Sequence, residues 1–212
     1  MNHSPQFRTW LENRISKELP GESAQYKLAP FKRKEEEQMF LKKGAKPRKS
    51  AVLMILYPQD GLIHVPMIIR TVYDGVHSGQ IGLPGGKFEE EDEYLVNTAI
   101  RETKEEISVQ VDELEIIGQL SALFVPVSNF IIHPFIAWMD QKPEFKPEEK
   151  EVQEILEIPL TYMTQAENRE TRRIKTAKGY SIKAPGIPIG DNFLWGATAM
   201  ILSEFLEIID SY

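Results

Sequence analysis

Apolar residues at helical spacing predict three main helices. Ser4 can cap the first helix and Pro20-Gly21 can end it, while Asp92 can cap the second. The third has apolar residues along one side and is predicted to be strongly amphipathic. The helices are predicted over 4–19, 92–107 and 192–209, with shorter ones around 35–43 and 160–168.

Strand-like runs alternate with these helices. A continuous apolar run over 51–57, a Pro-Gln-Asp-Gly turn and a second apolar run ending at Arg70 predict a β-hairpin. Because strands and helices are interleaved without strict βαβ alternation, an α/β or α+β layered domain is expected. The remaining strands are predicted over 114–120, 121–124, 131–139 and 152–159, with a hairpin arm over 171–182.

The composition narrows the chemistry that is available. The 212 residues include no cysteine, which excludes disulfides, thiolate metal sites and a cysteine nucleophile, so any metal must be held by oxygen or imidazole. No run of 18 apolar residues occurs, which argues against a membrane partner, and the first residues lack the apolar core of a signal peptide. A cytoplasmic location is therefore expected. The net charge of −7 argues against nucleic acid as a partner.

The charge is distributed unevenly. Residues 32–49 hold eight basic and three acidic residues, and a solvated connector with a short helix is the ordinary interpretation of such a run. Residues 87–106 hold eight acidic residues against three basic ones. The predicted helix over 92–107 therefore carries the main excess of negative charge.

Three glutamates share one face of that helix. Glu102, Glu105 and Glu106 fall within an arc of about 100°, beside an apolar stripe that faces the core. Like charges at this spacing repel each other, and a divalent cation such as Mg²⁺ or Mn²⁺ would reverse the penalty. The alternative is a solvated acidic face. Gly85-Gly86, which permits close backbone approach, and Arg101, which can brace the preceding loop, favour the metal site.

Segment 86–109 resembles the Nudix box, the conserved motif of the Nudix hydrolases. The matching residues are Gly86, Glu93, Arg101, Glu102, Glu105, Glu106 and Val109. The loop from Gly86 to Glu93 holds six residues rather than five, which leaves open whether Asp92 or Glu93 pairs with Arg101. Ser108 also replaces a glycine, and Thr103 occupies an apolar position.

The resemblance implies a Nudix-type α/β/α sandwich with a mixed β-sheet, plus an N-terminal and a C-terminal helix. The corresponding division is an N-terminal helix and polar connector over 1–49, packed on a hydrolase domain over 50–212. The implied activity is Mg²⁺- or Mn²⁺-dependent hydrolysis of a nucleoside diphosphate derivative. Glu105 and Glu106 would be the main metal ligands, helped by Glu102 and the carbonyl of Gly85, while Arg101 supports catalysis. The general base would be Glu102 or a later glutamate, chosen from Glu148, Glu149, Glu151 and Glu154, of which Glu151 is preferred.

Residues before the box resemble the subgroup that hydrolyses coenzyme A and its thioesters, and the similarity spans most of 51–205. Arg70, Thr71, Gly79 and Pro84-Gly85-Gly86 fall in register, whereas Gly75 and Leu83 replace an arginine and a phenylalanine. The 3′-phosphate of coenzyme A would then need another basic group, from connector 32–49 or from Arg169, Arg172, Arg173, Lys175 and Lys178. The predicted substrate contacts are Arg70, His77, Gly79, Gln80 and Gly86. His77 can equally be a turn or packing residue, and His133 is interpreted as structural.

Three hypotheses follow. The first is a Nudix pyrophosphohydrolase for coenzyme A or an acyl-CoA, with ADP-ribose, NADH or a nucleoside diphosphate sugar as alternatives. The second is a non-catalytic nucleotide-binding regulatory module, and the third is an acidic scaffold without a ligand. The expected partner is a small-molecule nucleotide. The oligomeric state stays open, a homodimer included.

Overall fold

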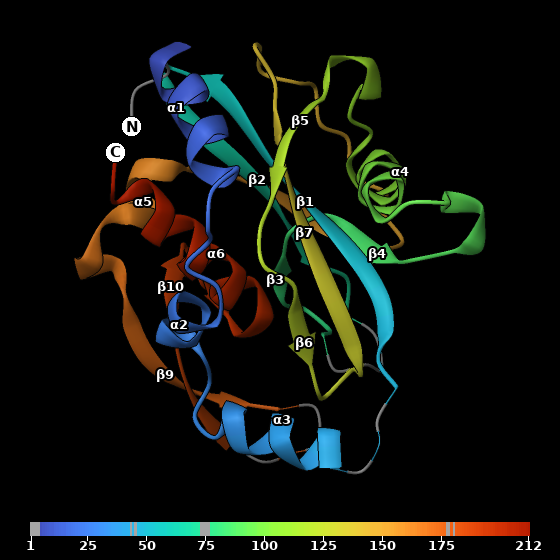
Figure 1. Ribbon diagram of the computed structural model, residues 1–212, viewed down its shortest axis with the longest axis vertical. Coiled ribbons are helices and arrows are strands. Elements are labelled where there is room, and N and C mark those ends of the chain that lie inside the picture. The colour runs from blue at the N-terminus through green and yellow to red at the C-terminus, as the bar shows by residue number, and fades with distance from the viewer. Residues whose placement is uncertain (1–4, 43, 45, 73–76, 177–178, 180) are drawn as a thin grey trace.

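A mixed β-sheet forms the centre of the molecule (Figure 1). The computed structural model describes residues 5–42, 44, 46–72, 77–176, 179 and 181–212. In this part of the chain the sheet has eight strands, which are β1 (Arg48–Gln59), β2 (Leu62–Arg70), β3 (Ile81–Gly82), β4 (Gly85–Lys87), β5 (Glu115–Gln119), β6 (Leu123–Val125), β7 (Phe130–Trp138) and β8 (Val152–Pro159).

Strand β1 is the organising strand of this sheet. It runs parallel to β7 over nine residue pairs, from Arg48 opposite Phe130 to Leu56 opposite Trp138. It pairs antiparallel with β2 through the predicted hairpin and with β4 at its other end. The segment between β2 and α4 contains β3 and β4, and β4 places Gly85 and Gly86 directly beside β1.

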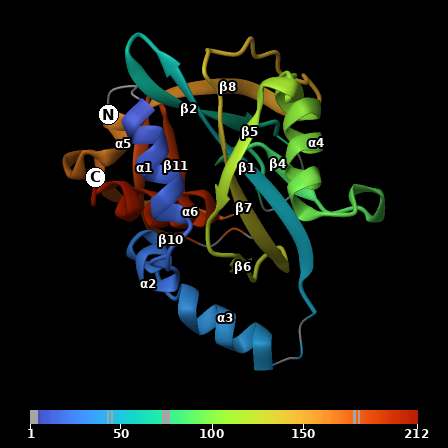
Figure 2. The ribbon, with the colours of Figure 1, turned by 45° about the horizontal axis from the view of Figure 1, so that its top comes forward.

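Helices cover both faces of the sheet (Figures 1 and 2). One face packs against α4 (Leu95–Ile107), with Ala99 and Ile107 in one apolar cluster with Leu53 of β1. The other face packs against α1 (Pro5–Ile15) and α6 (Gly196–Ile209), with Phe7 and Phe205 in the larger cluster. The predicted α/β/α arrangement with a mixed sheet is therefore confirmed.

The remaining elements surround this sandwich. β9 (Glu170–Lys175), β10 (Ser181–Ile189) and β11 (Asn192–Trp195) form a second, antiparallel sheet, of which the predicted arm over 171–182 is a part. No helix in the described ranges has the length and apolarity that a membrane crossing requires. The short helices are α2 (Glu22–Gln25), α3 (Arg33–Lys42), α5 (Leu160–Thr164) and four 3₁₀ turns, η1 (Tyr26–Leu28), η2 (Glu90–Asp92), η3 (Val111–Glu113) and η4 (Ala166–Asn168).

Helix α1 packs into the main core rather than beside it. Its buried residues are Phe7, Leu11 and Ile15. The ring of Tyr212 meets that of Phe7 in a T-shaped contact and that of Trp10 at a tilt of 57°. The predicted cap Ser4 lies outside the described residues. The division at residue 49 stays a prediction.

Two predicted helix starts are wrong. Asp92 does not cap α4, which begins at Leu95, because the Asp92 carboxylate instead accepts hydrogen bonds from Thr98 Oγ1 and Arg101. The segment predicted as a helix from 192 begins as β11, and α6 starts only at Gly196, where φ is 71°. Helix α6 is also buried on more than one side, because α2 covers part of the surface that the sheet leaves free (Figure 1).

A buried carboxylate ties the N-terminal segment to α6. Glu204 has no exposed surface, and its two oxygens accept hydrogen bonds from Gly21 N, Gln25 Nε2 and both the backbone N and the Oγ of Ser121, at 2.6–3.2 Å. Four neutral donors thus satisfy one carboxylate. This network joins three segments that are far apart in the sequence.

Candidate active site

Two glycines bring strand and helix into close contact. Gly85 has φ 147°, and a Cβ there would lie 2.3 Å from the Ala51 carbonyl oxygen on β1. A Cβ on Gly86 would lie 2.4 Å from Cδ of Glu102. Only glycine therefore permits the Glu102 carboxylate to lie directly over the β4 backbone. The predicted close approach at this pair of residues is present in the structure.

Arg101 braces the loop before α4, as the sequence predicts. Its guanidinium donates to both carboxylate oxygens of Asp92, at 2.7 and 3.0 Å, and to the carbonyl of Lys87 at 3.2 Å. Of the two partners that the sequence leaves open for Arg101, Asp92 and Glu93, the structure shows Asp92. The neighbouring Glu93 has a positive φ of 62°. Hydrogen bonding to Arg101 holds the pKa of Asp92 well below its usual range.

Arg101 also contacts two of the three glutamates. Its Nη1 lies 3.0 Å from Glu102 Oε1 and 3.3 Å from Glu105 Oε2. The Glu102 side chain is 15% exposed, whereas that of Glu105 is 60% exposed and lies at the outer rim of the site. Burial raises the pKa of Glu102 above its usual value.

The third glutamate is buried. Glu106 Oε1 accepts a hydrogen bond from Arg70 Nη1 at 3.1 Å, and its Oε2 accepts one from the Gly85 backbone N at 2.8 Å. Arg70 Nη2 in turn donates to the Gly85 carbonyl oxygen at 3.0 Å. Burial raises the pKa of Glu106 to about 7, although the positive charge of Arg70 acts in the opposite direction. Arg70, predicted as a substrate contact, therefore also belongs to the carboxylate cluster.

These donors suit a divalent cation by type. Glu102, Glu106 and the Gly85 carbonyl present hard oxygen atoms, and Gly86 leaves the space that Glu102 needs. Within the described ranges, however, no three acidic or imidazole side chains already form a metal-binding group. The guanidinium groups of Arg70 and Arg101 contact these carboxylates instead.

The loop before β8 is fastened to the same site. Glu148 N donates to the carbonyl of Glu106 at 2.9 Å, and Thr71 N donates to the carbonyl of Glu151 at 3.0 Å. Besides burial, the negative charge of Glu151 contributes to the raised pKa of both Glu102 and Glu106. The Glu151 side chain is exposed, and its charge lies close enough to Glu102 and Glu106 to raise the pKa of both. Its role as general base stays a prediction.

The other predicted substrate contacts lie near the end of β2. His77 Nδ1 is 3.1 Å from Gln80 Oε1, and burial lowers the pKa of His77. Gly79 has φ 65° in the same turn, and Arg70 N donates to the carbonyl of Gln80 at 3.1 Å. The turn therefore holds the backbone of Arg70 in place through this hydrogen bond. Gly75, whose identity departs from the coenzyme A subgroup, lies outside the described residues.

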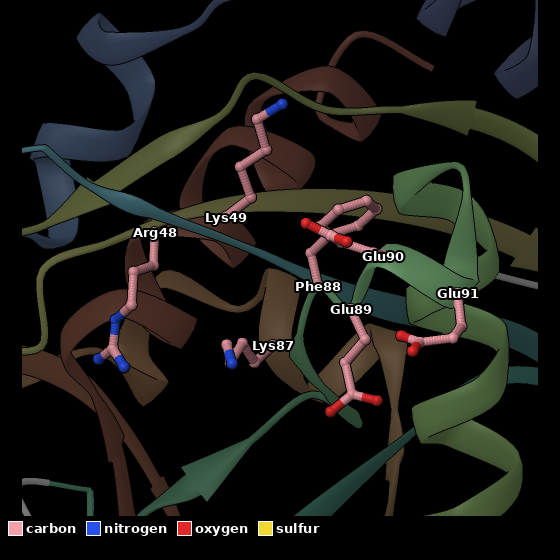
Figure 3. Close-up of a pocket in the computed structure, with 7 residues that line it drawn as sticks. All are labelled: Arg48, Lys49, Lys87, Phe88, Glu89, Glu90 and Glu91. Carbon is pink, nitrogen blue, oxygen red and sulfur yellow. The ribbon is translucent and has the colours of Figure 1, made fainter.

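The two basic clusters differ in their surroundings. Arg48 and Lys49 line a cavity of about 650 Å³ together with Lys87, Phe88 and the acidic residues 89–91 (Figure 3). Sequence reasoning missed Lys87, although its position directly after Gly86 is a usable signal. Both clusters place an arginine over an aromatic ring, Arg48 over Phe130 at 4.0 Å and Arg172 over Phe193 at 4.6 Å. Arg172, on the second sheet, also forms an ion pair with Glu170, and Lys178 lies outside the described residues. His133 is partly buried, and burial lowers its pKa.

Comparisons with known proteins identify the family of this chain and proteins that share its fold. A family model described as the NUDIX domain matches residues 47–179. The mitochondrial coenzyme A diphosphatase NUDT8 of Homo sapiens is 29% identical over 171 residues, which cover 78% of this chain and 71% of that protein. An uncharacterized Nudix hydrolase, NudL, of Pectobacterium atrosepticum is 29% identical over 174 residues, which cover 77% of this chain and 84% of that protein. The crystal structure of a MutT/nudix family protein from Enterococcus faecalis shares the fold with a TM-score of 0.55, at 14% identity, over 99% of this chain and 76% of that one.

Proposed function

Because the chain belongs to the Nudix family and is a pyrophosphohydrolase, we propose that it hydrolyses the diphosphate of coenzyme A or an acyl-CoA with Mg²⁺ or Mn²⁺. Nudix hydrolases generally use divalent metal ions. The observation that carries the proposal is the cluster of Glu102, Glu106 and the Gly85 carbonyl beside Arg70, at the position where the sequence resembles the coenzyme A subgroup. The similarity to a coenzyme A diphosphatase supports the substrate class.

The metal ion would be held by Glu102, Glu105, Glu106 and the Gly85 carbonyl. When bound, it supplies positive charge to the diphosphate and acidifies a water molecule. Arg101 holds Glu102 in position directly, and it holds the preceding loop in position through Asp92. Glu151 is the proposed group that accepts the proton of the attacking water, since it is exposed and its charge acts on both inner glutamates.

The cavity beside β4 is the proposed binding place for the 3′-phosphate. In Figure 3, Arg48 and Lys87 lie on the same side of the strands, as expected from the pairing of Lys87 with Ser50. Neither they nor Lys49 form an ion pair with a carboxylate in the described part of the chain. Phe88 adds an apolar surface. Because Lys87 follows Gly86, the cavity adjoins the carboxylate cluster.

The decisive experiment compares coenzyme A with 3′-dephospho-coenzyme A, ADP-ribose, NADH and a nucleoside diphosphate sugar as substrates. We expect coenzyme A to have the highest kcat/KM, and 3′-dephospho-coenzyme A to have a KM roughly tenfold higher, the effect of one lost charged contact. Preference for ADP-ribose, NADH or the sugar nucleotide would refute the substrate assignment.

The cavity is tested by removing its charges. The double variant Arg48→Gln/Lys87→Gln should raise KM for coenzyme A about tenfold while leaving KM for 3′-dephospho-coenzyme A unchanged. Lys42→Gln, an exposed position at the end of α3, is the control for loss of a connector charge. If Arg172→Gln/Arg173→Gln produces the selective effect instead, the 3′-phosphate binds at β9 and the cavity assignment is wrong.

A further inference from the structure

Arg70 bridges two oxygen atoms of the carboxylate cluster. One terminal nitrogen contacts Glu106 Oε1 at 3.1 Å, and the other contacts the Gly85 carbonyl at 3.0 Å. The Glu106 side chain is 2% exposed, so the guanidinium supplies nearly all the positive charge that this carboxylate meets. A planar guanidinium with two parallel donors suits such a pair of acceptors.

The same two oxygens are those that the metal site requires. Glu106 and the Gly85 carbonyl are two members of the proposed ligand set, and in the structure both accept hydrogen bonds from one arginine. Two cations in contact with the same oxygen atoms repel each other strongly in a buried site. A metal ion and the Arg70 guanidinium therefore compete for these positions.

Arg70 can leave its position, whereas Arg101 is fastened. Arg101 is held by both oxygens of Asp92 and by the Lys87 carbonyl, and neither residue belongs to the proposed ligand set. The Arg70 side chain is 27% exposed and that of Arg101 is 28% exposed, so the difference between them lies in their partners. The neighbouring Gly82 leaves ordinary contact space beside Arg70 Nε, since a Cβ there would be 3.7 Å away. An arginine side chain has enough rotatable bonds to move its guanidinium while its backbone stays in β2.

We propose that Arg70 is a displaceable counter-ion: it neutralises Glu106 in the metal-free protein, is expelled when the metal ion enters, and then binds the diphosphate of the substrate. The first step rests on the contacts of Arg70 with Glu106 and Gly85, whereas the second rests on the proposed metal site and the third on the proposed substrate. The arrangement couples binding of the metal ion to binding of the substrate, because the metal ion frees the Arg70 guanidinium from Glu106 for the diphosphate. It also explains how one residue can be both a partner of Glu106 and a substrate contact.

The first test measures Mn²⁺ binding to the metal-free full chain, without substrate. Arg70→Gln should bind Mn²⁺ about tenfold more tightly than the wild type, since the competing charge is gone, and Arg70→Lys should lie between them. Arg172→Gln on β9 is the control for loss of an arginine and should bind as the wild type does. Equal or weaker Mn²⁺ binding by Arg70→Gln would mean that Arg70 only organises Glu106, and would overturn the proposal.

The second test uses the wild-type protein, so it does not depend on the folding of a variant. Arginine side chains are modified with phenylglyoxal with and without Mn²⁺, and the modified peptides are quantified by mass spectrometry. We expect Mn²⁺ to increase modification of Arg70 several-fold while Arg101 is unchanged. Protection of Arg70 by Mn²⁺, or no change, would contradict displacement. Increased modification in a protein that does not hydrolyse coenzyme A would retain this inference and refute the substrate assignment alone.

Discussion

Two buried glutamates lie on opposite faces of the same sheet, and their surroundings are opposite in kind. Glu204 on α6 is 0% exposed and receives four hydrogen bonds from neutral donors. Glu106 on α4 is 1% exposed and receives one bond from a backbone N–H and one from the cation Arg70. Glu102 and Glu151 add negative charge near Glu106.

The difference shows how the same residue type serves folding in one place and chemistry in another. Neutral donors from two distant segments fix Glu204 and leave no oxygen for a ligand. Glu106 is held by one backbone N–H and one cation, while burial and its acidic neighbours raise its pKa to about 7. A buried carboxylate whose pKa is raised in this way is typical of a functional centre rather than of a structural bond.

The largest expected effect is a loss of activity, which should occur on substitution of Glu106 and not of Glu204. Glu106→Gln should lower kcat/KM about 1,000-fold, or roughly 4 kcal/mol of transition-state stabilisation, because an amide oxygen carries no charge for a metal ion. The folded protein should persist, since Gln retains the shape of the side chain. The measurement is steady-state hydrolysis at saturating Mg²⁺, with the melting temperature as a check of folding. Activity equal to that of the wild type would remove Glu106 from the metal site.

The matched substitution on the other face should affect stability instead. Glu204→Gln places an amide N–H₂ against donors, so the free energy of unfolding should fall by about 3 kcal/mol. At 25 °C the folded variant should retain kcat and KM within about twofold, because its network does not touch the carboxylate cluster. Urea denaturation and initial rates test this pair of expectations. A variant as stable as the wild type, or one selectively impaired in KM, would contradict the conclusion that Glu204 serves folding rather than catalysis.

Local patterns in the sequence predict the elements that both glutamates occupy. The hairpin of β1 and β2 follows from two apolar runs around a turn, and α4 follows from its apolar stripe. The box motif also locates the glycine pair, Arg101 and the three glutamates. These features depend on neighbours within a few residues, so periodicity and spacing carry them.

The contacts that decide the roles of the residues are long-range. Arg70 and Glu106 are 36 residues apart, and Gln25 and Glu204 are 179 residues apart, so neither pair is visible in a local pattern. Asp92 resembles a helix cap because aspartate favours that position, but its tertiary partner Arg101 decides its role. Likewise, a glutamate on a helix is expected to be exposed to solvent, but α2 and the loop at Ser121 cover Glu204 on α6.

The smallest expected effect is the pH dependence of stability in the metal-free protein. The pKa of Glu106 is about 7 in the folded chain against 4.5 in the reference state, so the folded chain binds this proton more tightly than the unfolded chain does. Its contribution to stability is therefore fully present below pH 4.5 and is lost as the pH rises through 7. Glu106→Gln mimics the protonated form at every pH, so between pH 6 and 8 its free energy of unfolding should rise by about 1 kcal/mol relative to the wild type. Urea denaturation in EDTA across this range measures the difference, and parallel pH profiles would show that Glu106 is not the group whose ionisation opposes folding.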